Sequence, residues 1–196
     1  MKTIGVTGGV GAGKSKILSY IQEHYNCCIL RADEVAHLLE EPGNECYDRL
    51  VQLLGEQILQ PDKTIDKKKM AELIFSDENL LKKTNAIIHP EVKKYIINAI
   101  EQEKKKNQIS YFFVEAALLI EEHYDELLDE MWYIYTDKKI REQRLMENRH
   151  YSAKKVADIC RGQLSETEFR KHCNVEIENN GDLNVTYEQI KKIMGE

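Results

Sequence analysis

The chain has 196 residues, 42% of them hydrophobic and 32% charged, which suits a folded protein with one domain or a domain carrying an embedded subdomain. The formal net charge of −6 argues against general nucleic-acid binding, and no apolar run approaches the roughly 20 residues of a membrane span. The five cysteines form no CxxC pair and no metal-ligand spacing, and the first residues lack the apolar stretch of a signal peptide, so we expect reduced thiols and a cytoplasmic location.

Apolar runs alternate with helical patterns along the chain, which predicts an α/β protein with a mainly parallel, five-stranded sheet. The strands are expected within the apolar runs at 2–7, 27–33, 110–120, 131–136 and 173–180. The helical patterns outside the long central stretch lie at 14–25, 137–148, 152–164 and 183–194. Residues 34–106 are polar and helical and too long for a single crossover, which indicates an inserted helical domain.

The first predicted strand runs directly into a glycine-rich segment, GGVGAGKSK, at residues 8–16. Gly8, four further residues, Gly13, Lys14 and Ser15 form the P-loop pattern. Glycines let the backbone turn its N–H groups inward, and the helix that starts near Lys14 adds its positive end, so the segment suits phosphate binding. The alternative is a strand-to-helix turn whose glycines have no special role. The residues predicted to bind the nucleotide are Gly9, Gly11, Ala12, Gly13, Lys14, Ser15 and Lys16.

Four side chains are candidates for phosphate-transfer chemistry. Lys14 is placed to reach the β- and γ-phosphates, and we expect it to be solvated without ligand; Ser15 offers a hydroxyl to Mg²⁺. Glu115, at the end of the third strand, is a candidate for holding the same ion through water. Asp33 ends the second predicted strand, where ligands bind in open α/β sheets, and its carboxylate is able to take the proton of an attacking hydroxyl. Because a helical pattern follows Asp33, an N-cap is its alternative role.

Characteristic segments follow one another from residue 3 to about 193: VTGGVGAGKS, ADEVAH followed by EPG, TNAIIHPEV, ALLIE, RLMENR, Gln163 and IENNG. In this order and spacing they resemble the dephospho-CoA kinase family. The resemblance implies a P-loop NTPase three-layer fold and the ATP- and Mg²⁺-dependent phosphorylation of the 3′-hydroxyl of dephospho-CoA, the last step of coenzyme A synthesis. We expect this small-molecule substrate, no nucleic-acid or membrane partner, and a monomer or weak homo-oligomer.

The resemblance also implies roles for single residues. Asp33 matches the family's catalytic base. His89 lies in the insertion that forms the CoA-binding domain of the family and is a candidate substrate contact; the alternative is that the pair His89-Pro90 only marks a helix start, with Pro90 at the first helical position. Arg144 matches a family arginine and suits the charge of a transferring phosphoryl group. An exposed helix face is the interpretation for most of the charged neighbours, which are Lys138, Lys139, Arg141 and Glu142.

The expected division of the chain follows from these matches. The nucleotide-binding core takes 1–33, 107–136 and 165–196, the substrate domain takes 34–106, and a lid takes 137–164. Six positions depart from the family's usual residues: Lys16, Lys67, Ala117, Asn148, Ile159 and Asn174.

Two other functions stay open on the sequence. A nucleoside monophosphate kinase-like enzyme also has a lid and an acceptor domain, although the long insertion with its His-Pro pair speaks against it. A nucleotide-binding module that has lost catalysis would not need Asp33. A GTPase is disfavoured because the chain has no NKxD motif.

Overall fold

The structure, a computed structural model, describes residues 1–195 and divides the chain into two compact units. The first unit contains Met1–Ile29 and the chain from Asn107 onward. The second unit is the continuous segment Leu30–Lys106. Asp33 and His89 therefore belong to the second unit, and the glycine-rich segment to the first.

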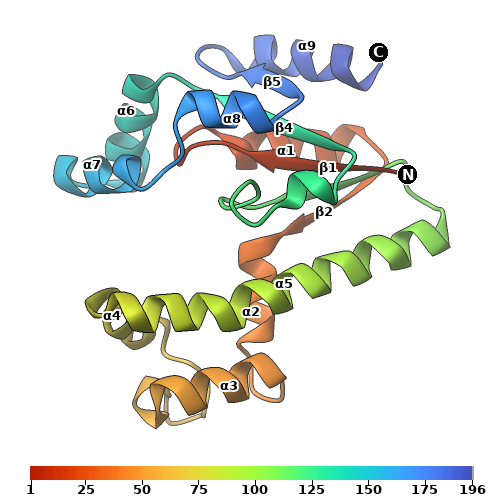
Figure 1. The fold of residues 1–196 in the computed structure, drawn as a ribbon. Helices are drawn as coiled ribbons and strands as arrows, with labels where there is room; N and C mark the ends of the chain where they lie inside the picture. Colours follow the sequence, from red (N-terminus) through yellow and green to blue (C-terminus); the bar gives the residue numbers. More distant parts are fainter. Residues whose placement is uncertain (196) are drawn as a thin grey trace. The chain divides into compact units, whose positions relative to one another are not determined.

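A five-stranded sheet is the centre of the first unit (Figure 1). Its strands, in the spatial order β2-β3-β1-β4-β5, are β1 (Lys2–Thr7), β2 (Cys27–Arg31), β3 (Tyr111–Glu115), β4 (Glu130–Tyr135) and β5 (Val175–Glu178). The pairs of β1 with β3, β1 with β4 and β4 with β5 are all parallel, which confirms the predicted α/β class. Val6 pairs with Glu115 on one side and with Trp132 on the other, so the carboxyl ends of the central strands meet at one edge.

The first unit contains helices that pack on opposite faces of this sheet. Its helices are α1 (Lys14–His24), α6 (Lys138–Arg149), α7 (Ala153–Arg161), α8 (Glu166–His172) and α9 (Leu183–Met194), with a short 3₁₀ helix η2 (Tyr124–Glu126). On one face, Ile17 and Ile21 of α1 and Ile190 of α9 share a core with strand residues such as Trp132. On the other face, Phe169 of α8 stacks on Tyr133 with ring centroids 4.7 Å apart.

Helix α8 has no counterpart among the predicted elements. It has only seven residues, too few for a clear helical period, and it begins where Ser165 accepts a hydrogen bond from the main-chain N–H of Glu168. The single pattern predicted at 152–164 ends earlier, at Arg161 of α7.

The second unit is helical, as the composition of residues 34–106 predicts. Its elements are α2 (Ala32–Leu39), α3 (Glu45–Leu54), the 3₁₀ helix η1 (Glu56–Ile58), α4 (Lys67–Ser76) and α5 (Glu78–Lys106). The buried side chains of α3, η1 and α4 form one apolar cluster that includes Leu50, Ile58 and Met70. Asp66 starts α4 by accepting hydrogen bonds from the N–H groups of Lys68 and Lys69.

The expected helix start at Pro90 is wrong. Helix α5 is 29 residues long and passes through Pro90 without ending. An interior proline cannot donate to the carbonyl four residues earlier and costs about 3 kcal/mol in an isolated helix. Here Thr84 before the proline and Val92 and Ile96 after it are buried, so packing on both sides offsets that cost. His89 is thus an interior, half-buried helix residue.

The thiols behave as packing groups. All five cysteines are free, and the described residues contain no group of three or more His, Cys, Asp or Glu side chains that could hold a metal ion. Burial raises the pKa of the Cys27 thiol to about 11 and that of Cys173 to about 12, with nearby Cys28 and Asp125 adding to the respective shifts. Both thiols are therefore protonated and unreactive near neutral pH.

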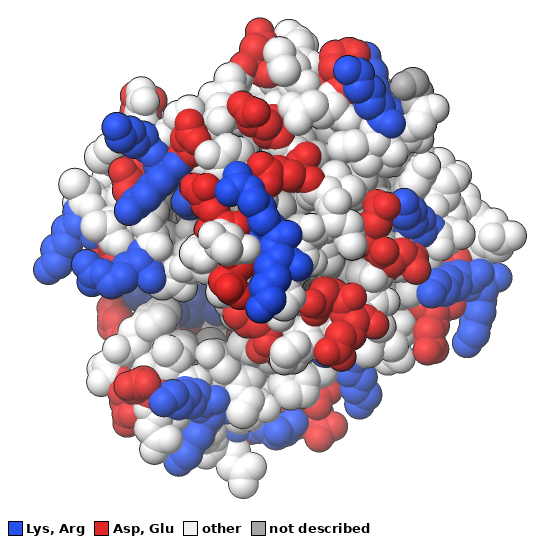
Figure 2. Space-filling view, turned by 45° about the horizontal axis from the view of Figure 1, so that its top comes forward, with Lys and Arg blue, Asp and Glu red and all other residues white. Residues whose placement is uncertain are grey.

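The surface carries intermingled charges of both signs over the face shown in Figure 2. Many of the ion pairs join neighbouring turns of one helix, as between Lys82 and Glu78, which lie 2.8 Å apart. Such exposed pairs contribute only about 0.3–0.5 kcal/mol each. None of the helices within residues 1–195 is both long and apolar enough to cross a membrane.

One ion pair of the second unit is largely buried and supports a stability test. The Glu40 side chain is 5% exposed and pairs with Lys67, whose side chain is 47% exposed. Lys67→Met leaves the carboxylate buried without its partner, so we expect a loss of about 1–3 kcal/mol, less than for a fully buried pair because water reaches Lys67. Urea denaturation measures this loss in the free energy of unfolding. Glu40→Gln, which needs no counter-ion, should lose less; equal stability of Lys67→Met and the parent chain would contradict the estimate.

Candidate active site

The glycine-rich segment leaves the end of β1 as a loop that enters α1. Gly11 and Gly13 have φ values of 87° and 93°, in the left-handed region that glycine adopts without strain. Gly13 is the N-cap of α1, and no side chain caps the helix. Among residues 1–195, no acceptor lies opposite the main-chain N–H groups of Val10, Gly11 and Gly13. These donors, at the positive end of a helix, form a cradle suited to an anion.

The same glycines are also required by close packing on the other side of the loop. A methyl group added at Gly9 would lie 2.1 Å from Nη1 of Arg141, and one at Gly11 would lie 2.9 Å from the main-chain oxygen of Arg141. At Gly13 the added carbon would lie 2.3 Å from Nδ2 of Asn179. Helix α6 and the chain after β5 therefore press directly on the phosphate loop.

The lysine of the loop is more enclosed than expected. The Lys14 side chain is 12% exposed, its Nζ donates a 2.8 Å hydrogen bond to the carbonyl of Gly8, and Oε1 of Glu115 lies 3.9 Å away. The expectation of a solvated ammonium group is wrong, because the turn at Gly8 places a carbonyl oxygen within its reach. The ammonium group is held over the loop, next to the carboxylate at the end of β3.

Two side chains predicted to serve a metal ion fit a magnesium site shared with phosphates. Ser15 is exposed in the first turn of α1, and its hydroxyl has no hydrogen-bond partner within the described part of the chain. Glu115 is part-buried beside Lys14. Mg²⁺ usually keeps several waters and takes few protein ligands besides substrate phosphates, so one hydroxyl and one carboxylate suffice.

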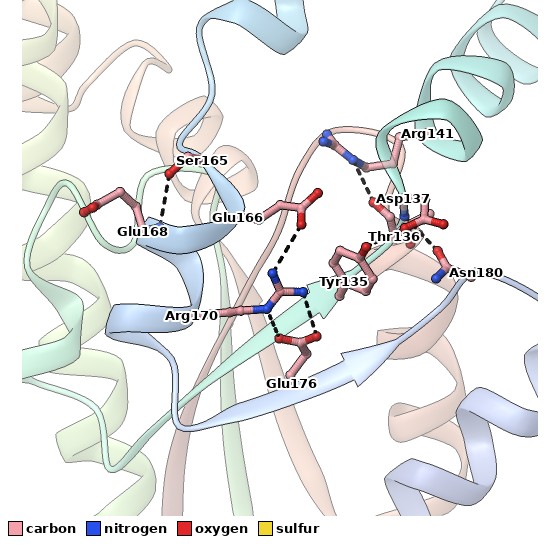
Figure 3. Close-up of polar contacts among 10 residues, drawn as sticks. All are labelled: Tyr135, Thr136, Asp137, Arg141, Ser165, Glu166, Glu168, Arg170, Glu176 and Asn180. Carbon is pink, nitrogen blue, oxygen red and sulfur yellow. Dashed lines mark hydrogen bonds and ion pairs between the residues drawn. The ribbon is translucent and has the colours of Figure 1, made fainter.

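Two arginines of α6 lie against the loop. Nη2 of Arg144 donates to the main-chain oxygen of Asn179 at 2.9 Å. Arg141 donates from Nε to the carbonyl of Thr136 (Figure 3) and from Nη1 to Oε1 of Gln163, at 3.1 and 2.9 Å. Neither guanidinium has a carboxylate within 4.0 Å among residues 1–195, so both charges face neutral oxygens only.

Arg141 is the functional candidate that sequence reasoning missed. The exposed-face interpretation fails for it because its side chain turns from α6 toward Gly9 instead of into solvent. A signal was present in Gln163, which the family resemblance singled out and which proves to be its partner.

A polar network fixes the strands next to the loop (Figure 3). Arg170 of α8 forms a two-pronged contact with Glu176 of β5 and a further bond to Glu166. Tyr135, at the end of β4, donates to Asp137, whose N–H donates 2.7 Å to Asn180. The carboxyl ends of β4 and β5 are thereby held together where α6 begins.

Asp33 differs from both of its expected positions. Strand β2 ends at Arg31, and Asp33 is the second residue of α2, whose N-cap is Arg31, so Asp33 neither ends the strand nor caps the helix. It is exposed, and it has no hydrogen bond or ion pair with any residue in 1–195. The Asp33 carboxylate therefore has no structural role among the described residues.

Comparison with known proteins identifies a family and several similar proteins. A family model described as dephospho-CoA kinase matches residues 2–184. The chain is 32% identical to a dephospho-CoA kinase of Oceanobacillus iheyensis and 34% to one of Streptococcus agalactiae, covering 97% and 96% of this chain and 95% of each relative. It is also similar to the crystal structure of TT1252 from Thermus thermophilus, with a TM-score of 0.80 and 26% identity, covering 98% and 96% of the two chains.

The packing around the loop predicts different losses of stability for two glycine-to-alanine substitutions. Gly11→Ala combines a left-handed φ with a clash against main-chain atoms of α6, so we expect a loss of about 1–3 kcal/mol. Gly9→Ala meets the ends of the Arg141 and Gln163 side chains, which are able to move, so its loss should be about 1 kcal/mol or less. Chemical denaturation of both variants decides the order; losses of the same size would show that α6 does not constrain the loop.

Proposed function

We propose, because the chain belongs to the dephospho-CoA kinase family, that it transfers the γ-phosphoryl group of ATP to the 3′-hydroxyl of dephospho-CoA. The observation that carries the proposal is the family match over residues 2–184 of a chain whose phosphate loop has main-chain N–H groups that pair with no acceptor in residues 1–195. The products are coenzyme A and ADP. We expect the reaction in the cytoplasm and the protein to act as a monomer or weak homo-oligomer.

The loop and its neighbours bind and neutralise the phosphates. The N–H groups of Gly11 and Gly13 donate to phosphate oxygens, and the Lys14 ammonium group moves from the Gly8 carbonyl to the nucleotide. Arg144 supplies a planar donor as negative charge develops on the transferring group. Because their partners in the structure are neutral oxygens, the arginines keep their full charge for the phosphates.

Ser15 and Glu115 would hold Mg²⁺, the serine through its hydroxyl and the glutamate through a bound water. When bound, the ion would neutralise negative charge on the phosphates. The Lys14 ammonium lies 3.9 Å from Oε1 of Glu115, which places this carboxylate beside the loop.

Asp33 is proposed as the general base. Its exposed carboxylate takes the proton of the 3′-hydroxyl while an oxygen lone pair forms the new bond to the γ-phosphorus. The bond from that phosphorus to the β,γ-bridging oxygen breaks, and ADP leaves with the electron pair. The absence of structural partners for Asp33 among the described residues supports this role.

The second unit is proposed to bind the substrate, with His89 on α5 as one contact. Residues 137–164, which contain α6 and α7, are proposed as a lid over the nucleotide. Both assignments extend the family resemblance to segments that are helical in the structure.

A substrate panel tests the function. The purified chain is given Mg²⁺ and ATP with dephospho-CoA, AMP, CMP or water, and ADP release is followed. We expect turnover only with dephospho-CoA, and a loss of more than about 100-fold in Lys14→Met, which keeps the side chain's length but removes its charge. Preference for AMP or CMP would favour a nucleoside monophosphate kinase, and binding of ATP without turnover a nucleotide-binding module.

Asp33→Asn separates catalysis from structure. The amide keeps the shape of the side chain but cannot accept the proton, so turnover should fall by about 10²–10⁴-fold. The charge of the native Asp33 stabilises the first turn of α2 by about 0.3–1 kcal/mol at most. Its removal should therefore change the melting temperature by no more than a few degrees, and the affinity for ATP should persist. Turnover and thermal melting of the same preparation are compared. Normal turnover would remove Asp33 from the mechanism.

A further inference from the structure

Asn179 is the first asparagine of the IENNG segment, to which the proposed mechanism gives no role. It follows β5 and is 1% exposed. A buried amide side chain must satisfy its donors and its acceptor, and those of Asn179 are directed at specific partners. Nδ2 donates to the carbonyl of Ala12 at 2.7 Å, and Oδ1 accepts from the hydroxyl of Thr186 on α9 at 3.1 Å.

The contact with Ala12 determines which way one peptide group of the phosphate loop faces. The oxygen and hydrogen of a trans peptide point in opposite directions, and the described chain has no cis peptide bonds. Holding the Ala12 carbonyl on Asn179 therefore directs the N–H of Gly13 away from Asn179. This N–H is one of the unpartnered donors of the cradle.

The pairing also specifies the orientation of the Asn179 amide. The Ala12 carbonyl only accepts, so it must face the NH₂ end. The Thr186 hydroxyl lies 3.1 Å from both Oδ1 of Asn179 and the main-chain oxygen of Glu178, and its one proton is shared between these two acceptors. The Thr136 hydroxyl likewise lies 3.1 Å from both the Ala12 oxygen and the main-chain oxygen of Asn179. Reversing the amide would set two acceptors against each other.

The main chain of Asn179 adds a second link. Its N–H donates 2.8 Å to the carbonyl of Tyr135 on β4, and its carbonyl accepts from Arg144. One residue thus joins the sheet edge, the phosphate loop and the arginine proposed to contact phosphates.

We propose that Asn179 is a positioning residue for the transfer reaction, which orients the Gly13 N–H toward the nucleotide through Ala12 and holds Arg144 through its own carbonyl. The proposal rests on the proposed function, because it takes the anion bound by the loop to be a nucleotide phosphate. Its primary readout, ADP binding without acceptor, does not depend on which molecule is phosphorylated.

Asn179→Asp is the sharpest variant, because it replaces the NH₂ donor by a carboxylate oxygen of nearly the same shape. We expect at least a tenfold weaker affinity for ADP by calorimetry and a lower kcat, with the KM for dephospho-CoA changed by less than about threefold. Thr186→Val, which removes the hydroxyl that orients the amide, should weaken ADP binding by a smaller factor. Thr186→Ser retains that hydroxyl and should restore most of the affinity.

Ile177→Val is the matched control for general damage to β5 and its core. It should lower the melting temperature without changing ADP affinity well below that temperature. The proposal is overturned if Asn179→Asp and Thr186→Val lose thermal stability but bind ADP as tightly as the parent chain. If Asn179→Asp does not fold, the contrast between Thr186→Val and Thr186→Ser decides. ADP binding with no turnover on dephospho-CoA would refute the proposed acceptor while leaving the Asn179 test intact.

Discussion

The loop between β1 and α1 must present bare N–H groups on one side while its other side is packed against protein. Main-chain polar groups are normally paired wherever they are buried, so leaving several donors unpaired requires strong control of every peptide around them. Left-handed glycines provide the geometry at Gly11 and Gly13, and α6 and Asn179 provide the opposing surface. The order of the strands follows the same need, because placing β1 between β3 and β4 surrounds its carboxyl end with Glu115 and the start of α6.

The positively charged side chains beside the phosphate loop have different partners from those on the surface. The chain is acidic overall, and many of its exposed lysines pair with nearby carboxylates. Arg141 and Arg144 instead rest on carbonyl and amide oxygens. Neutral oxygens orient a guanidinium without cancelling its charge, so the field at the loop exists before any ligand arrives and needs little reorganisation.

The sequence predicts those features that depend on neighbouring residues. The phosphate loop, the five strands and the helix after the loop all follow from local patterns, and all are confirmed as elements of the fold. Features that depend on packing between distant segments were missed or wrong: the direction of the Arg141 side chain, the carbonyl that captures Lys14, and the continuation of α5 through Pro90. Asp33 shows that small errors in strand boundaries also matter. Strand β2 ends two residues earlier than predicted, so Asp33 lies inside α2 and does not cap it.

The interruption of the first unit by the second has a consequence for the order in which the chain folds. The register pairs Lys2 of β1 with Tyr111 of β3, so β1 gains no partner strand until the whole of Leu30–Lys106 has left the ribosome. The helical segment is continuous and forms its contacts within its own 30–106 range, whereas the sheet closes across that whole intervening stretch. A second unit that folds early shortens the flexible part of that stretch and lowers the entropy lost on closure. The apolar residues of β1 depend on this timing to be covered.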